Sequence, residues 1–196
     1  MADTIFLRRA RAALLALALA GSPAACGDDL NADFPRPSGP VEVTLYDVFA
    51  GPIDRPSGVD LVQGTGSSGV PRPVRIDLTE NWDVAFAVLN GSATWLPRGF
   101  FDGFEASSGI VALDLGFDEV ERVPEDRTLY ETEQPVPVVQ GTTYAIRSRN
   151  NPVVSLPCRI FGKMVVDELQ LDPARVSVRI LWNPNCDQRV VTPENR

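Results

Sequence analysis

The chain has 196 residues and a formal net charge of −8, from 18 basic and 26 acidic side chains, and it contains no histidine. The acidic balance argues against nucleic acid and against electrostatic docking on anionic lipid, because both need a basic surface. The lack of histidine excludes Ser-His-Asp and Cys-His catalysis, histidine-ligated zinc and bis-histidine haem.

The N-terminus has the order of an export signal. Arg8, Arg9 and Arg11 precede an uninterrupted Ala/Leu run at 12–20, and a Gly-Ser-Pro break follows it. Such a run is too short to cross a bilayer, which needs about 20 apolar residues, but it has the length of a signal-peptide core. Residues 1–25 are therefore predicted to be a lipoprotein signal peptide.

Cys26 follows two alanines at the end of this leader. In bacterial lipoproteins that cysteine is diacylated and becomes the new N-terminus, and two acyl chains suffice for stable anchoring. Pro23 departs from the usual pattern, which has Leu there, so a plain secretory signal with an unmodified thiol remains an alternative. Gly27 follows the cysteine, whereas an Asp at that position retains lipoproteins at the inner membrane of enteric bacteria. We therefore expect a lipid-anchored envelope protein, on the outer membrane, with its face undetermined.

Residues 26–40 are polar and rich in proline, and we interpret them as the lipidated cysteine and a flexible tether. The leader carries three arginines and one aspartate, a net +2, so the chain without it has a charge of −10. Residues 41–196 have the length of one domain.

Short alternating or continuous apolar runs, separated by turn residues, recur along this domain. No stretch keeps helical spacing over three turns, and 17 prolines and 15 glycines are spread through the chain. Asn90-Gly91 is a hairpin turn signal. The pattern predicts an all-β fold, an antiparallel sandwich or barrel-like single domain. Strands are expected at 41–46, 59–62, 74–78, 82–89, 93–96, 109–115, 117–123 and 142–148.

Two longer runs, Arg159 to Leu169 and Arg175 to Trp182, flank an Asp-Pro turn signal. A fold about Asp172 makes the numbers of paired residues sum to 344 and brings the apolar faces together. The expected pairs are Gly162/Trp182, Met164/Ile180, Val165/Arg179, Val166/Val178, Asp167/Ser177 and Leu169/Arg175.

The same register places Cys158 opposite Cys186. Opposed residues of antiparallel strands have Cα atoms about 4.5–5.5 Å apart, within the range that a disulfide accepts. An oxidising envelope compartment favours the bond. A disulfide between Cys158 and Cys186 is predicted, with two free buried thiols as the alternative.

Several segments resemble, in the same order along the chain, strands of a known protein family. The stretch Trp82-Asp83-Val84-Ala85-Phe86 resembles the HmuY family of bacterial haem-binding envelope lipoproteins, and so do later segments at 117–124, 143–148 and 161–166. The resemblance implies an all-β fold and an envelope address. Family members ligate haem iron through His or Met, whereas this chain has no His, and Met164 is its only Met after the leader. No cofactor or metal is therefore assigned.

An unusually aromatic stretch at 95–104 supplies the candidate ligand contacts. These are Trp95, Arg98, Phe100, Phe101 and Phe104. The expected function is a non-catalytic binding module for an unknown ligand, and the alternative is a structural or accessory subunit of an envelope complex.

Catalysis is not expected, because no motif selects a pair from the available carboxylates. The carboxylates considered are those of Asp83, Asp114, Asp118, Glu119 and Glu121.

Overall fold

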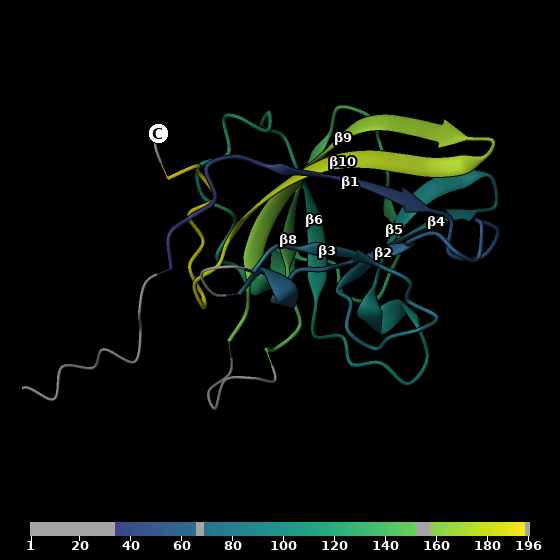
Figure 1. Cartoon of the computed structure of the whole chain (residues 1–196), viewed down its shortest axis with the longest axis horizontal. Helices are drawn as coiled ribbons and strands as arrows, with labels where there is room; N and C mark the ends of the chain where they lie inside the picture. The colour runs from purple at the N-terminus through teal and green to yellow at the C-terminus, as the bar shows by residue number, and fades with distance from the viewer. Residues whose placement is uncertain (1–33, 66–68, 152–157, 195–196) are drawn as a thin grey trace, which may run out of the picture. The chain divides into compact units, whose positions relative to one another are not determined.

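The computed structural model describes residues 34–65, 69–151 and 158–194. The expected leader, Cys26 and residues 27–33 lie outside them. The described chain forms two antiparallel sheets of five strands each, so the all-β prediction is confirmed, with open sheets rather than a closed barrel (Figure 1).

The first sheet has the order β1-β10-β9-β8-β6. Its strands are β1 (Val41–Tyr46), β10 (Ala174–Asn183), β9 (Phe161–Leu171), β8 (Thr143–Arg147) and β6 (Gly109–Leu113). The second sheet has the order β3-β2-β4-β5-β7. Its strands are β3 (Arg72–Val74), β2 (Gly58–Asp60), β4 (Val84–Leu89), β5 (Ser92–Pro97) and β7 (Val136–Pro137).

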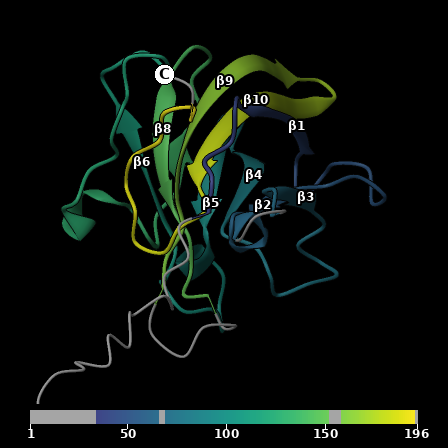
Figure 2. The ribbon, with the colours of Figure 1, turned by 60° about the vertical axis from the view of Figure 1, so that its left-hand side comes forward.

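Three 3-10 turns, η1 (Val62–Gly64), η2 (Arg98–Phe100) and η3 (Arg127–Leu129), lie in the connections. Figure 2 shows β6 and β8 on the left, the short strands β2 and β3 on the right, and the curved β9-β10 hairpin across the top.

The main core lies between the two sheets, because alternate residues of each strand point to the same side. Val178, Ile180 and Trp182 of β10 face Phe86 of β4 and Trp95 of β5, and all five are at least 95% buried. Part of each outer face is covered as well. Trp82, Ala85, Ala87 and Leu96 form a separate apolar cluster on the second sheet.

The β9-β10 hairpin confirms the predicted register at its open end. Val178 pairs with Val166, Ile180 with Met164, and Trp182 with Gly162. Nearer the turn the prediction is wrong by one residue, because β9 contains a β-bulge opposite Ser177/Val178. Ser177 pairs with Glu168 and Val176 pairs with Leu169, not Asp167 with Ser177 or Leu169 with Arg175.

The bulge has a clear physical reason. A bulge adds one residue to one strand and so reverses which face the later side chains occupy. Without it Leu169 would point to the polar face of the sheet. With it Leu169 packs against the core and Asp167 stays outside, where it accepts a bidentate hydrogen bond from Arg179 at 2.9–3.1 Å.

The predicted disulfide is present. Cys158 and Cys186 are bonded, with Cα atoms 5.1 Å apart and a sequence separation of 28. Both lie just beyond the ends of β9 and β10, and Cys158 belongs to the main core. The bond therefore closes the open end of the hairpin.

Two expected strands form turns instead. After β3 the chain turns at 75–78, where Leu78 N donates to Arg75 O and the Arg75 side chain donates to Asp77, and Leu78 is left 70% exposed. At 117–123 the N–H groups of Glu119 and Val120 donate to Gly116 O. Local hydrogen bonds override the period-two pattern in both places. The two-residue β7 was not predicted.

Candidate functional site

The aromatic stretch at 95–104 is divided between the two faces of the second sheet. Trp95 is fully buried in the core between the sheets, and its ring lies 5.9 Å from that of Phe86. Phe101 and Phe104 lie on the outer face, with ring centroids 5.3 and 5.5 Å from Trp82. The five expected contacts therefore do not form one surface.

Arg98 stabilises this outer cluster. Its guanidinium lies 4.6 Å from the Phe104 ring centroid and 5.3 Å from that of Trp82, and it donates to the backbone oxygens of Glu80 and Trp82. Both hydrogen bonds come from Nη1, and the buried Nε of Arg98 has no hydrogen-bond partner. The exposed edge of the cluster is Phe49, which is 60% exposed and lies 6.3 Å from Phe101.

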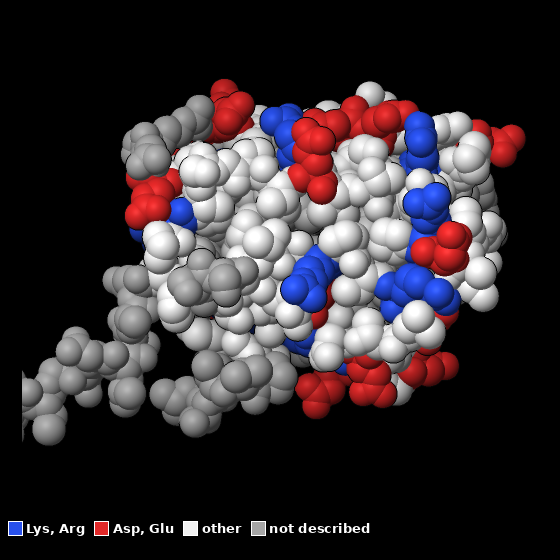
Figure 3. Space-filling view, in the orientation of Figure 1, with Lys and Arg blue, Asp and Glu red and all other residues white. Residues whose placement is uncertain are grey.

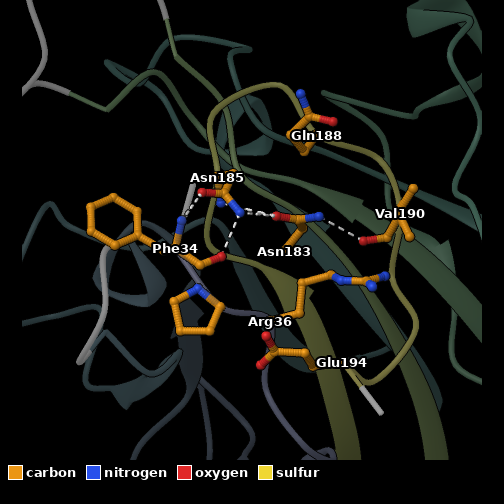
Figure 4. Close-up of a pocket in the computed structure, with 8 residues that line it drawn as sticks. Phe34, Arg36, Asn183, Asn185, Gln188, Val190 and Glu194 are labelled. Carbon is orange, nitrogen blue, oxygen red and sulfur yellow. Dashed lines mark hydrogen bonds between the residues drawn. The ribbon is translucent and has the colours of Figure 1, made fainter. Parts of the chain in front are cut away.

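A second feature is a cavity of about 480 Å³ between residues 34–36 and the C-terminal segment. Figure 4 shows two of its amide side chains, those of Asn183 and Asn185, bonded to the chain itself. Asn185 accepts from Phe34 N at 2.6 Å and donates to Phe34 O at 2.8 Å, while Asn183 accepts from Asn185 and donates to Val190 O. The amides therefore act as a clamp on the backbone rather than as free ligand donors.

The clamp extends along the chain. Arg36 donates to the Thr192 hydroxyl at 2.6 Å, and Glu194 N donates to Pro37 O at 3.3 Å. The last part of the expected tether at 26–40 is thus bonded to the C-terminal segment. Seven residues remain between Cys26 and Phe34, a span of at most about 28 Å when extended.

A buried ionic network joins the ends of the two sheets. Arg149, just after β8, places its guanidinium 2.9 Å from Asp60 of β2 and 3.1 Å from Asp83, which precedes β4. Asp83 also accepts from the N–H groups of Leu61 and Arg149, each at 2.7 Å. Complete burial raises the pKa of Asp83, and Arg149 opposes that rise.

This network has a structural role. Every carboxylate oxygen of Asp83 has a donor, and Asp60 accepts from Val62 N as well as from Arg149. The other carboxylates considered for catalysis are exposed in the connection after β6 and do not surround Asp83. These are Asp114, Asp118, Glu119 and Glu121.

Lys163 is a second buried cation, on β9. Its ammonium donates to the carbonyls of Phe117 and Val120, both at 2.7 Å, and lies 4.6 Å from the Phe117 ring. The side chain of Lys163 points away from the main core, toward the connection at 116–123. Its hydrogen bonds hold that connection over the outer face of the first sheet. The lysine ties that connection to β9, a role that its sequence context did not reveal.

Arg147, at the end of β8, has a different environment. Tyr144 and Ile146 point into the main core, whereas Ala145 belongs to the outer cluster. Arg147 alternates to that outer side, where it lies over the Tyr130 ring at 5.5 Å. It is 5% exposed and its buried Nε has no hydrogen-bond partner.

Burial lowers the pKa of Arg147, and the positive charges of two further arginines, Arg159 and Arg127, lower it further. Arg159 donates to Ser107 O and, at 3.3 Å, to Ser148 O. In the described residues none of the three forms an ion pair. The sequence signal was an arginine directly after the apolar residues Tyr144, Ala145 and Ile146 of a predicted strand.

Metal chemistry has little support among the residues that the structure describes, which contain no group of three or more Cys, Asp or Glu side chains placed to hold an ion. Met164, the one methionine that could meet haem iron, is fully buried between the sheets. Figure 3 shows acidic and basic side chains interspersed over one face rather than gathered into a basic patch.

Comparison of the chain with protein-family models, with curated proteins and with solved structures gave no match. Within the described ranges, no helix has the length and apolarity that a bilayer crossing needs. The function is therefore argued from the residues of this chain.

Proposed function

We propose that this chain is a lipoprotein of the cell envelope, anchored through Cys26, whose β-sandwich is a non-catalytic binding module. The observation that carries the binding role is Arg147, a buried guanidinium whose charge no described carboxylate meets. Buried charges in proteins are paired or serve a site, so an unpaired one points to a ligand.

The address rests on the leader. Asn185 fastens Phe34 to the body, so in a chain anchored at Cys26 the body would be attached to the lipid by a segment of at most about 28 Å. The resemblance to the HmuY family agrees with such an address. It does not extend to haem, because the chain lacks histidine and Met164 is enclosed by the core.

Labelling cells with a palmitate analogue tests the anchor. We expect label on the chain and recovery in the membrane fraction, and Cys26→Ser should abolish both. The double variant Cys158→Ser/Cys186→Ser is the matched control, since it removes two cysteines and should keep the label. An unlabelled wild-type chain in the soluble fraction would refute the anchor.

The membrane can be tested with Gly27→Asp. In an enteric host an outer-membrane lipoprotein should shift to the inner-membrane fraction of a density gradient when aspartate follows the lipidated cysteine. An unchanged distribution would argue against outer-membrane sorting through Gly27.

Titration with micromolar haem should leave the absorbance spectrum of the haem unchanged, and a shifted band would restore haem as the ligand.

The alternative function, an accessory subunit, is favoured by Phe49. This ring is 60% exposed and continues the aromatic cluster of Phe101 and Trp82 to the surface. Pull-down from solubilised membranes separates the two functions. A stoichiometric protein partner lost in Phe49→Ser would support the accessory role, while recovery of the chain alone would support the binding module.

A further inference from the structure

Arg147 holds its guanidinium in a fixed position. It is the last residue of β8, pairs with Phe161 of β9 and is 5% exposed, with its guanidinium carbon 5.5 Å from the Tyr130 ring centroid. Tyr130 is itself anchored by its hydroxyl, which donates to Pro124 O at 3.0 Å. The ring therefore orients a donor whose buried Nε has nothing to bind.

Arg127 and Arg159 add two positive charges to the same place. Arg127 lies in η3 and is exposed, whereas Arg159 lies just before β9 and is directed to the Ser107 and Ser148 carbonyls. The backbone brings the three segments together, because Tyr130 N donates to Arg127 O at 3.3 Å and Arg159 reaches the carbonyl of Ser148, the residue after Arg147. Beyond the effect of burial, the charges of Arg159 and Arg127 both lower the pKa of Arg147, in agreement with this arrangement.

The described chain offers these arginines no direct counter-ion. Asp187 and Asp83 act on Arg159 from a distance and raise its pKa against the dominant effect of burial, but neither makes an ion pair with it. Residues 152–157, which precede Cys158 and are not described, contain no acidic side chain. An unpaired buried charge is costly, so a counter-ion from outside the chain would stabilise this cluster.

We propose that Arg127, Arg147 and Arg159 bind the oxyanion of a ligand, a carboxylate or a phosphate group. Guanidinium donors suit both anions, because their planar fork presents paired N–H groups to two oxygens. Arg147 supplies the oriented buried donor, and Arg159 supplies a second positive charge. Arg127 is exposed and lies where the anion would enter from the solvent. The inference deepens the proposed binding role and rests on it, but it does not depend on the lipid anchor.

Calorimetric titration of the purified chain with inorganic phosphate, and separately with acetate, tests the site at constant ionic strength set by sodium chloride. We expect binding of at least one anion, with a matching rise in melting temperature as the anion concentration increases. Arg147→Met should weaken binding about tenfold or more, because it removes a charge-assisted hydrogen bond. Arg127→Gln should weaken it less.

Arg72→Gln is the matched control, since Arg72 is an exposed arginine of β3 outside the cluster, and its affinity should equal that of wild type. If Arg147→Met does not fold, Arg147→Lys keeps the charge but loses the fork and should also weaken binding. Binding of neither anion, or equal binding by all variants, would overturn the site. Such a failure would also remove the support that Arg147 gives to the binding role, but it leaves the Cys26 labelling result unaffected, so the anion site and the lipid anchor fail separately.

Discussion

Arg147 and Arg149 are two residues apart, and their exposed fractions are nearly equal, at 5% and 7%. Arg149 reaches two carboxylates of the other sheet and also donates to Asn81. Arg147 faces an aromatic ring and two more arginines. One strand end thus carries one guanidinium with an internal counter-charge and one without.

The difference separates a structural charge from a candidate functional one. Removing one partner of a buried ion pair is strongly destabilising, because the other charge is left without compensation. An unpaired buried charge should behave in the opposite way, since its removal leaves nothing uncompensated. We therefore expect a loss of stability when Arg149 is replaced, and no loss or a gain when Arg147 is replaced.

The largest effect is expected for Arg149→Met. Asp60 and Asp83 would remain buried without their cation, and the free energy of unfolding should fall by about 3–5 kcal/mol. Chemical denaturation measures the change. Arg179→Met is a control that breaks a half-exposed pair with Asp167, for which we expect a loss below about 1 kcal/mol. Equal losses in the two variants would contradict the structural role of the buried network.

The disulfide should rank next. Cys158 directly precedes Arg159, and the bond closes a loop with a sequence separation of 28. Cys158→Ala/Cys186→Ala should lower the free energy of unfolding by about 2–4 kcal/mol. Oxidised and reduced wild-type protein provide the matched comparison, and a reducing agent should leave the stability of the double variant unchanged. A reductant-independent wild type would show that the bond does not form.

Arg147→Met should be neutral or stabilising by about 1 kcal/mol when no anion is present, because methionine replaces an unpaired charge with a side chain of similar length. Denaturation in anion-poor buffer measures this. A loss close to that of Arg149→Met would show that Arg147 has an internal role, and it would remove the contrast between the two.

The smallest effect is expected at Glu131. This residue directly follows Tyr130, whose ring lies against Arg147. Its carboxylate accepts the N–H groups of Gln134, Glu133 and Thr132, and these bonds lower its pKa below the usual 4.5. The stabilisation is complete above about pH 4.5 and is lost as pH falls through the lower pKa of the folded state. Glu131→Gln should therefore lose less stability between neutral and acidic pH than wild type. An identical pH dependence would contradict this.

Much of the fold follows from local patterns. The alternation in β1 and β8, the Asn-Gly turn and the apolar faces of the β9-β10 hairpin were sufficient to place those strands, and the open-end register correctly joined Cys158 to Cys186. The turn at 75–78 and the bulge in β9 escaped prediction, because local hydrogen bonds and core packing decide them.

The candidate site was harder to predict. The aromatic stretch was expected to form one surface, yet Trp95 and Phe101 lie on opposite faces of the second sheet, as alternation along β5 and the η2 turn require. The arginines of the proposed anion site come from three separate segments, and nothing in their spacing connects them.

Composition and short-range order alone determined the all-β class and the disulfide, because both depend on the periodicity of side chains along neighbouring strands. Only the tertiary structure decided which of the buried charged side chains has a partner of opposite charge. Whether a buried arginine meets a carboxylate depends on segments up to 89 residues away, as Asp60 and Arg149 show. The sequence contains Arg147 and Arg149 as near neighbours, and only the packing of the two sheets pairs Arg149 with two carboxylates and leaves Arg147 without one among the described residues.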